Sequence, residues 1–533
     1  MNRQTGLAIY TRVCHVLQIF ILGVIIVGIP SSNIAMSIGG ISLAALFLIS
    51  PHLIDRVKWV FKTPVSILAL ALFIWHVIGF TWSDNLSEAI KDVRIKLPLL
   101  LFPIAIAGMY ALTNRWRLIL IRLYVAAVVT NTLVCYVYYL FNKDLSIHNF
   151  RDISLFISHI RLSLNICLSL VLLWSYPHIL SIKYKAIIKL LLSLWLIYFL
   201  SILQSATAIF VAGLIALFFG VYFWLKLSGK WRIIAGLSVI AFIGVSGSIL
   251  KAEYEAYFVP GENQQLADKK LKKYTVNGNN YAHDLQNTEL ENGNYVYRYI
   301  CLPEIRKEWK SVSGTSVDSV IHTGYPVLSN LIRYLSSKGL RKDSIGIHAL
   351  SKADVEAVLR GQTNYKLVGA NGFVKRLYKL GYELNQFQAN KNPGGHSLLM
   401  RLEFLKAAGY LLQNNWVFGV GTGDLKPAFS EAYKNINTQL DNRWQHRAHN
   451  QFLSIWIALG LVGVFLFVAF WSYPLMQAKK YPIYAWLAWI VITGSYFIED
   501  TLETQAGVTF AIFFFSFFFL PGAPMSLELE CAG

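Results

Sequence analysis

Long apolar runs separated by short polar connections make up most of this chain. A helix that crosses a membrane needs about 20 mostly apolar residues, and twelve segments of the sequence approach that length and composition. These segments are residues 13–30, 33–50, 64–82, 97–113, 118–141, 160–177, 185–203, 205–226, 232–250, 449–474, 480–497 and 505–521. The pattern therefore predicts an all-α polytopic membrane protein with about twelve transmembrane helices.

Basic residues are concentrated in every second connection between the apolar runs. Lysine and arginine recur in residues 52–62, 115–117, 183–189, 226–232 and 479–480, whereas the intervening connections are nearly neutral or acidic. Cytoplasmic loops carry an excess of these two residues. The N-terminus is therefore expected in the cytoplasm, and an even number of spans places the C-terminus there as well. The first apolar run is long and lacks a convincing cleavage site, so it is expected to remain as the first span.

The sequence divides into four parts. Residues 1–250 are expected to form transmembrane helices 1 to 9, residues 449–521 helices 10 to 12, and residues 522–533 a C-terminal tail. Residues 251–448 are the only long polar segment. The predicted orientation places this segment outside the cytoplasm, where it is the candidate working domain.

Local patterns within the long polar segment predict mostly helices. An Asn292-Gly293 turn before alternating aromatic residues predicts one strand pair. Helical periodicity follows at residues 328–337, 352–360, 373–388 and 397–413. In the last of these, a stripe of leucines at helical spacing lies beside Arg401, which predicts an amphipathic helix resting on the membrane surface or on the top of the helix bundle.

Composition agrees with a membrane protein and limits the choice of partners. Of the 533 residues, 55% are hydrophobic and only 14% are charged, which is more apolar material than a soluble domain can cover. The net charge of +19 comes largely from lysine and arginine in short loops between apolar runs, so no nucleic-acid partner is expected. The five cysteines lie mainly in apolar segments, and no disulfide framework is expected.

Polar side chains gather where the tenth predicted span begins. His449 opens the span, Arg447 precedes it by two residues and Asn450 follows directly. A lone histidine at such a place is more often a polar helix-end residue than a catalyst. An ordinary imidazole, however, has a pKa near 6.5 and is largely neutral at pH 7, so it can accept a proton from a hydroxyl group. His449 is therefore the candidate general base, with Asn450 as a supporting residue.

Two further arginines are candidates for binding an anion. Arg161 begins the sixth predicted span, which runs in the same direction as the tenth. The alternative to an anion-binding role is an interfacial arginine whose side chain reaches toward water. Arg401 could equally lie on a solvated helix face. The N-terminal ends of both spans point the positive ends of their dipoles outward. Together with Arg447, these side chains suit a diphosphate, because a guanidinium grips phosphate oxygens with two parallel hydrogen bonds.

Two other groups of charged residues lie on the same predicted side. Arg94 and Lys96 precede the fourth span, either as a second phosphate-facing pair or as an interfacial turn balanced by Asp92, the latter being favoured. Asp500, together with Glu499 and Glu503 in the last connection, is interpreted as part of a solvated acidic loop. Its alternative role is to orient an arginine or the histidine.

Missing motifs narrow the chemistry. The sequence has no D-x-D, no H-E-x-x-H and no carboxylate pair at fixed spacing, so no metal site and no cofactor is expected. The glycines of GVGTGD (Gly419–Asp424) are not followed by GK[ST] and are interpreted as a tight turn. The apolar spans hold few ionisable residues, unlike those of ion-coupled transporters.

Two spacings carry a family resemblance. Arg401 and Leu405 form R-x3-L, and His449-Asn450 is followed by Gly460 and Gly463 as H-N-x9-G-x-x-G. Together they resemble the bacterial O-antigen ligase superfamily, polytopic glycosyltransferases that move a glycan from a polyprenyl diphosphate onto an acceptor. The order of spans around one large domain is similar over nearly the whole chain. Relatives often have Ser-Arg where this chain has Ser205-Ala206, so no phosphate contact is carried over to that point.

The resemblance implies a reaction and a place for it. His449 would act as the general base, and Arg161 and Arg401, helped by Arg447, would bind the diphosphate of an undecaprenyl-linked glycan donor, without a metal and with inversion. The first-ranked acceptor is a lipid A-core hydroxyl. The alternatives are a protein O-oligosaccharyltransferase or an O-antigen polymerase, and, from another class, a non-enzymatic flippase for lipid-linked glycans. The implied location is the bacterial inner membrane, with residues 251–448 forming a periplasmic domain and the site on the periplasmic side.

Overall fold

The computed structural model of the chain describes residues 3–141, 153–181, 183–260, 271–320, 326–370, 372–388, 393–395 and 397–524. Nearly all of the regular structure in these residues is helical, which confirms the predicted class. By contact clustering, the chain forms two compact units. The first comprises Met1–Lys143, Asn149–Phe219 and Met400–Gly533, and the second comprises Asp144–His148 and Gly220–Leu399.

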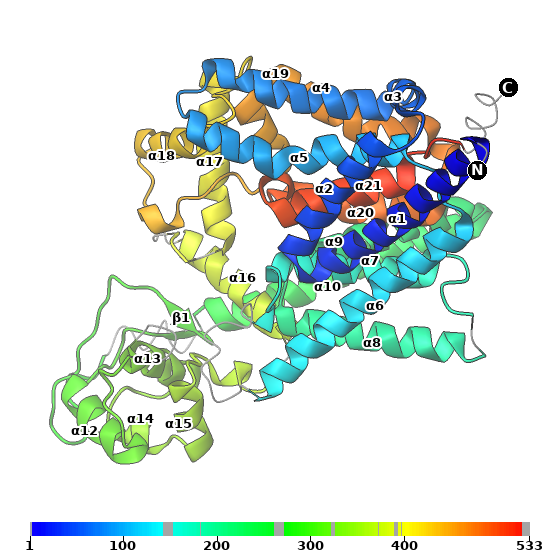
Figure 1. The fold of residues 1–533 in the computed structure, drawn as a ribbon. Helices are drawn as coiled ribbons and strands as arrows, with labels where there is room; N and C mark the ends of the chain where they lie inside the picture. Colours follow the sequence, from blue (N-terminus) through cyan, green and yellow to red (C-terminus); the bar gives the residue numbers. More distant parts are fainter. Residues whose placement is uncertain are drawn as a thin grey trace. The chain divides into compact units, whose positions relative to one another are not determined.

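Each of the twelve predicted apolar segments overlaps a helix (Figure 1). These helices are α1 (Arg3–Ser31), α2 (Asn33–Ile49), α4 (Pro64–Ile78), α5 (Leu86–Gly108), α6 (Asn114–Phe141), α7 (His159–Ser175), α8 (Lys185–Leu203), α9 (Ala206–Lys226), α10 (Gly229–Phe258), α19 (Gln451–Ser472), α20 (Ile483–Ile498) and α21 (Gln505–Phe519). Among the described residues, seven helices are long and apolar enough to cross a membrane, or up to eight if α2 and α3 (Leu53–Phe61), bent by 115°, are one span. The figure of twelve spans, the domain boundaries and the side on which each part lies remain predictions.

Helix α5 begins well before the apolar run that predicted it. The side chain of Asn85 accepts a hydrogen bond from the Glu88 N–H at 3.2 Å and caps the helix at Leu86. The polar stretch up to Lys96 is therefore helical too, and it carries charged side chains of both signs. These charges explain why α5 does not have the composition of a spanning helix over its full length.

The helices of the first unit pack around α21. This helix is apolar on all sides, and every residue from Gly507 to Phe519 is buried, as expected for a helix enclosed by others. It packs against α5, while α19 packs along α4 and α20 along α7 (Figure 1). The ends of α20 and α21 are joined by a short connection that contains the 3-10 helix η6 (Thr501–Glu503).

Two further helices pack in the first unit. Helices α17 (Ser397–Asn415) and α18 (Leu425–Asn435) pack together with the start of α19 in a core that includes Phe404, Leu411, Phe429, Tyr433 and Ile457. Leu402 and Leu405 of the leucine stripe are exposed, so the membrane-resting face of α17 stays a prediction. The alanines and Phe404 on the adjacent face allow the closer packing instead.

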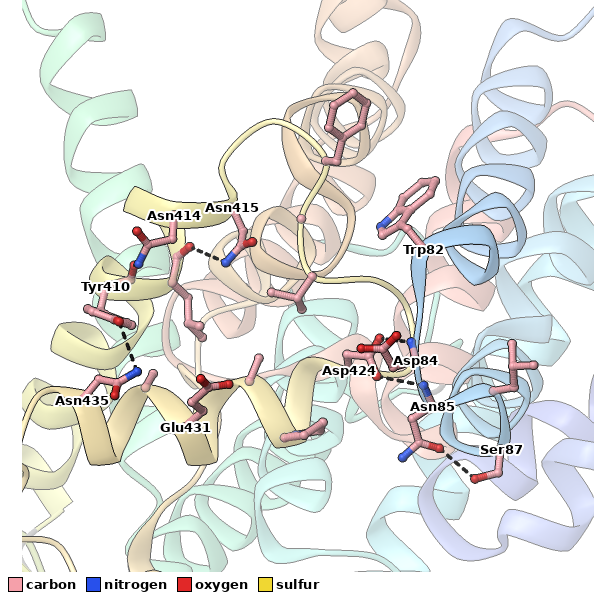
Figure 2. A pocket seen from close by; sticks show the side chains of 18 residues that line it. Trp82, Asp84, Asn85, Ser87, Tyr410, Asn414, Asn415, Asp424, Glu431 and Asn435 are labelled. Atoms are coloured by element: carbon pink, nitrogen blue, oxygen red, sulfur yellow. Dashed lines mark hydrogen bonds between the residues drawn. The ribbon is translucent and has the colours of Figure 1, made fainter.

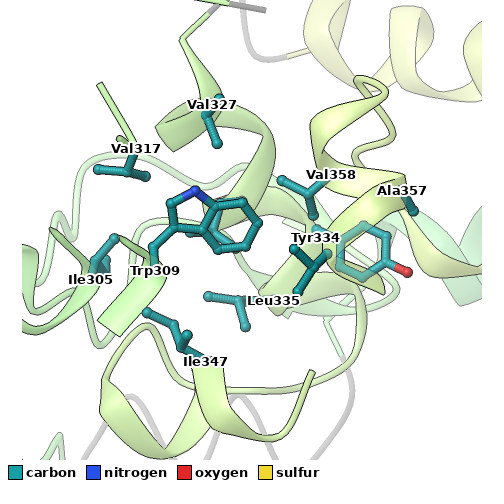
Figure 3. Packing of buried hydrophobic residues seen from close by; sticks show 11 residues of the cluster. Ile305, Trp309, Val317, Val327, Tyr334, Leu335, Ile347, Ala357 and Val358 are labelled. Carbon is teal, nitrogen blue, oxygen red and sulfur yellow. The ribbon is translucent and has the colours of Figure 1, made fainter. Parts of the chain in front are cut away.

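The second unit has its own core. Helices α12 (Leu302–Ser313), α13 (Val327–Ser337), α14 (Ser344–His348) and α15 (Lys352–Leu359) enclose Trp309, as Figure 3 shows. The predicted strand pair is confirmed as β1 (Leu290–Glu291) and β2 (Asn294–Tyr295), which pair antiparallel. The two turn residues both have positive φ, as this type of hairpin requires. Helix α16 (Gly372–Gln388) completes the unit, so all four predicted helical segments of the polar region are present.

Candidate functional site

Three buried carboxylates occupy the connection between α20 and α21. No more than 10% of the side chain of Glu499, Asp500 or Glu503 is exposed. The interpretation of this connection as a solvated acidic loop is therefore wrong. Removing three carboxylates from water is costly unless each is paired and hydrogen-bonded. Their partners include most of the residues that the sequence singled out.

Asp500 fixes the main chain at the start of α19. Its Oδ2 accepts from the His449 N–H at 3.1 Å, and its Oδ1 accepts from the Asn450 N–H at 3.1 Å and from the Ser454 hydroxyl at 2.6 Å. Asn450 is the N-cap, since its side chain accepts from the Leu453 N–H at 3.1 Å. The carboxylate also complements the positive end of the helix dipole. These bonds hold His449 at a φ of 47°, which is uncommon for a residue other than glycine.

The imidazole of His449 lies between a carboxylate and an aromatic ring. Its Nδ1 is 3.6 Å from Oε2 of Glu499, and its ring centroid is 5.4 Å from that of Phe404 on α17. The ring of His446 packs 6.1 Å away. The His449 side chain is 32% exposed. The ring is therefore oriented by its surroundings yet remains accessible from one side.

Arg401 meets the other oxygen of the same carboxylate. Its Nη2 donates to Oε1 of Glu499 at 3.1 Å, and the hydroxyl of Thr207 on α9 donates to that oxygen at 3.2 Å. A third of the Arg401 side chain is exposed, at 33%. Two residues that are 48 positions apart in the sequence, one from each motif of the family resemblance, thus approach one carboxylate.

Glu503 gathers a second group of cations. Arg447 Nη1 donates to its Oε2 at 2.6 Å and Lys96 Nζ donates to the same oxygen at 3.1 Å, while Gln451 donates to Oε1 at 3.2 Å. Lys96 also pairs with Asp92 at 2.6 Å, so the favoured expectation that Asp92 balances it agrees with this geometry. Asp92, Lys96, Arg447 and Glu503 line a cavity of about 220 Å³.

Arg161 lies behind the acidic connection. Its guanidinium donates to the Thr501 hydroxyl at 3.2 Å and to the Asp500 carbonyl oxygen at 3.3 Å, and the residue is 8% exposed. A Cβ on Gly507 would lie 2.9 Å from the centre of this guanidinium, so the glycine makes room for it. In this arrangement Arg161 binds the connection itself.

Arg94 does not join these clusters. It is two residues before Lys96 in α5, which corresponds to about 200° around the helix, so the two side chains leave opposite faces. Lys96 is buried, whereas Arg94 is exposed. The less favoured alternative, in which Arg94 and Lys96 face a phosphate as a pair, does not agree with this geometry.

The electrostatic balance differs from the predicted cationic pocket. Burial acts to raise the pKa of Glu499, but His449, Arg401 and Arg161 together lower it below its ordinary value. Burial also opposes ionisation of Glu503, yet Lys96 and Arg447 lower its pKa to about 2. For Asp500 burial prevails and raises the pKa. The site is thus an interleaved set of cations and carboxylates.

The glycine-rich turn anchors α17 to α19. Helix α19 is interrupted at Gly460, which has a φ of 67°, and a Cβ there would lie 2.0 Å from the Val417 carbonyl oxygen. The turn hydrogen-bonds to the backbone groups released by this break: Val420 and Gly421 donate to the carbonyls of Ile457 and Ala458, and Leu461 donates to that of Val417. Gly460 therefore serves a close backbone approach, and GVGTGD is a structural turn.

Glu499, Glu503 and Thr207 are the site residues that the sequence reasoning missed or undervalued. A signal was present, because IEDTLET places three carboxylates in one short connection between two apolar helices. Charged groups in such a position are rare unless they are paired. Among the described residues, no group of three or more His, Cys, Asp or Glu side chains is arranged to hold a metal ion.

Comparison with known families tests the resemblance read from the motifs. Residues 366–468 match the Wzy_C family model, described as O-antigen ligase, and this segment contains Arg401, Arg447 and His449. A comparison with curated proteins finds no match. The matched segment also contains Gly460 and Gly463 of the second motif. This match over residues 366–468 supports the resemblance to the O-antigen ligase family of membrane glycosyltransferases.

Proposed function

We propose that this protein transfers a glycan from undecaprenyl diphosphate to a hydroxyl of a lipid A-core acceptor, at the periplasmic face of the inner membrane. The observation that carries the proposal is the shared carboxylate: Arg401 and His449 face opposite oxygens of Glu499, and about a third of each side chain is exposed. A base and a phosphate-binding group are thus held close together on an accessible surface.

His449 is the proposed general base. Glu499 lies on the Nδ1 side of the ring, so the second nitrogen, Nε2, is left to accept a proton. As the acceptor oxygen attacks the anomeric carbon, its proton passes to Nε2. The bond between that carbon and the diphosphate oxygen breaks, and the diphosphate leaves with the electron pair. Attack from the face opposite the leaving group inverts the configuration at that carbon.

Arg401 and Arg447 are the proposed diphosphate ligands. Each is about one-third exposed and contacts its carboxylate through one terminal nitrogen, Nη2 in Arg401 and Nη1 in Arg447. Their remaining N–H groups can bind phosphate oxygens as negative charge develops on the leaving diphosphate. Because Arg161 is buried and binds the acidic connection, we assign it the role of positioning Glu499 and Asp500.

The identity of the acceptor is ranked by the motifs. A lipid A-core acceptor comes first because both spacings match, and protein O-oligosaccharyltransfer or O-antigen polymerisation are the alternatives. Glycan profiling of a deletion strain separates them. Unligated lipid-linked polymer indicates a ligase, single-repeat lipopolysaccharide indicates a polymerase, and unglycosylated protein indicates an oligosaccharyltransferase.

The experiment that tests the chemistry uses His449→Ala in a reconstituted assay with lipid-linked donor and acceptor. We expect transfer to be abolished while expression and thermal stability are unchanged. His348→Ala is the matched control, since His348 is exposed in the second unit and pairs only with Glu308. Wild-type turnover by His449→Ala removes the base assignment. Lipid translocation without transfer in the wild-type protein would instead support the flippase alternative.

A further inference from the structure

A large groove in the first unit shares no lining residue with the cavity beside Glu503. Figure 2 shows the groove. One wall is formed by the start of α5 and the residues before it, and the other by the end of α17 and by α18. Its volume is about 1250 Å³. Small-molecule sites commonly measure about 300–1,000 Å³. The groove is thus large enough for an extended ligand.

The groove lacks positive charge. None of the residues that line it is a lysine, an arginine or a histidine. It does contain the carboxylates of Asp84, Asp424 and Glu431, the Tyr410 hydroxyl and four asparagines. Phosphate and diphosphate are repelled by such a lining, because no cation offsets the carboxylates. The ligand of this groove is therefore not the charged part of a lipid-linked donor.

Hydrogen bonds occupy the amide nitrogens of asparagines on one wall. Asn414 Nδ2 donates to the Tyr410 carbonyl oxygen at 3.1 Å, and Asn415 Nδ2 donates to that of Leu411 at 3.4 Å. A main-chain carbonyl can only accept, so each amide nitrogen must face it, which leaves the amide oxygen for a ligand. Asn435 Nδ2 likewise donates to the Tyr410 hydroxyl at 3.1 Å. This wall presents hydrogen-bond acceptors.

The opposite wall offers a donor and an apolar edge. Asn85 uses its amide oxygen to accept from the Ser87 hydroxyl at 2.9 Å and from the Glu88 N–H at 3.2 Å, which leaves its NH₂ group for a ligand. At the edge, the ring of Phe418 is 65% exposed and packs edge-on against Trp82, with 6.5 Å between centroids. Acceptors, a donor and exposed aromatic surface match the hydroxyl groups and C–H faces of sugar rings.

The groove is connected to the proposed site through α17. Tyr410 follows Arg401 by nine residues in the same helix, which corresponds to about 14 Å along its axis. We infer that the groove binds an uncharged stretch of glycan, some sugars away from the reacting bond. This inference rests on the proposed function, because the glycan belongs to one of its two substrates, the donor or the acceptor.

The test measures binding without transfer. The purified chain in lipid nanodiscs is titrated with three probes: neutral oligosaccharide released from the donor, oligosaccharide released from the acceptor, and a lysine-rich peptide. We expect one oligosaccharide to bind and Asn414→Ala to weaken it about threefold to tenfold, the worth of a lost hydrogen bond. Glu431→Gln should have a similar effect. Asn442→Ala and Glu356→Gln, both outside the groove, are the matched controls.

The kinetic arm uses the same variants. Groove contacts are present in the ground state and the transition state alike, so KM for the bound substrate should rise while kcat is retained. The substrate whose KM rises identifies the source of the glycan. The inference is overturned if Asn414→Ala and Glu431→Gln both bind oligosaccharide and turn over like wild type, or if only the peptide binds. If His449→Ala loses transfer while the groove variants behave like wild type, the groove inference alone is refuted. If the groove binds oligosaccharide but His449→Ala is fully active, the proposed base alone is refuted.

Discussion

The Nδ1 atom of His449 lies 3.6 Å from Oε2 of Glu499. His449 directly precedes the N-cap of α19, whereas Glu499 follows the end of α20. The carboxylate can orient the imidazole and stabilise it when it becomes protonated, as an acidic residue does in other base-dependent sites. We therefore expect Glu499→Gln to lower kcat on the order of a hundredfold.

This effect of Glu499→Gln is measured as kcat in the reconstituted assay, with donor and acceptor saturating. The control is Glu356→Gln, an exposed glutamate whose ion pair lies within one helix. Thermal stability is measured in parallel, because Glu499 is buried and its loss also removes a partner of Arg401. A variant that is stable and fully active shows that Glu499 has no part in the reaction.

Arg401→Lys should be strongly impaired even though the charge is kept. A lysine ammonium cannot form the planar pair of hydrogen bonds that a guanidinium makes with phosphate oxygens. We expect kcat to fall at least about tenfold. This corresponds to a loss of about 1.4 kcal/mol of transition-state stabilisation. Arg443→Lys, at an exposed position paired with Asp441, serves as the control. Near-normal activity would make Arg401 a surface group.

Gly460→Ala should destabilise the first unit. The backbone of Gly460 has a φ of 67°, and an added Cβ would lie 2.0 Å from the Val417 carbonyl oxygen. Such a conformation alone costs a residue other than glycine about 1–3 kcal/mol, and the clash adds to this cost. Gly409→Ala is the control, because Gly409 lies within α17 with open space around it and should be neutral or slightly stabilising. Equal melting temperatures for the two variants contradict the assigned role of Gly460.

The stability supplied by Glu503 should depend on pH. Its pKa is lowered from an ordinary 4.5 to about 2, so the folded state binds its proton less readily than the unfolded state. That stability is complete above about pH 4.5 and is lost as the pH falls toward 2. The melting temperature of wild type should therefore exceed that of Glu503→Gln at pH 7, and the difference should narrow below pH 4.5. A difference that is constant down to pH 3 means that Glu503 is not paired as described.

Chelation should leave transfer unaffected. In the proposed mechanism the guanidinium groups of Arg401 and Arg447 carry the positive charge that stabilises the leaving diphosphate. Reconstituted enzyme treated with EDTA is therefore expected to retain its rate. Inhibition by EDTA that is reversed by one divalent cation shows that a metal takes part, and the arginines then need another role.

The sequence was sufficient for the helices but not for the pairing of charges. Apolar runs and a turn such as Asn292-Gly293 act locally, so the helices of the apolar runs, four helices of the polar segment and the small hairpin could be located without a structure. Helices α3, α12, α14 and α18 could not. The motif residues Arg401 and His449 were also found, because their spacing is informative. Their common partner Glu499 was not, since the contact between them depends on how α17, α19 and the last connection fold together.

Two other features lay outside the sequence pattern for a similar reason. The leucines of α17 form a regular stripe, but the helix also buries Phe404 and its alanines, because the shape of the neighbouring helices decides which face packs closely. The motif spacing does not show why a glycine is needed at position 460. The positive φ of Gly460 and its contact with Val417 depend on a turn more than 35 residues earlier, which helical periodicity does not reveal.

The interruption of α19 also has a mechanical consequence. Hydrogen bonds from Val420, Gly421 and Leu461, together with that from the Trp456 indole to the Trp416 carbonyl oxygen at 3.0 Å, join the end of α17 to α19 around its break. The helix that carries Arg401 and the helix that begins directly after His449 and Asn450 are therefore fastened to each other at a second place, away from the carboxylates.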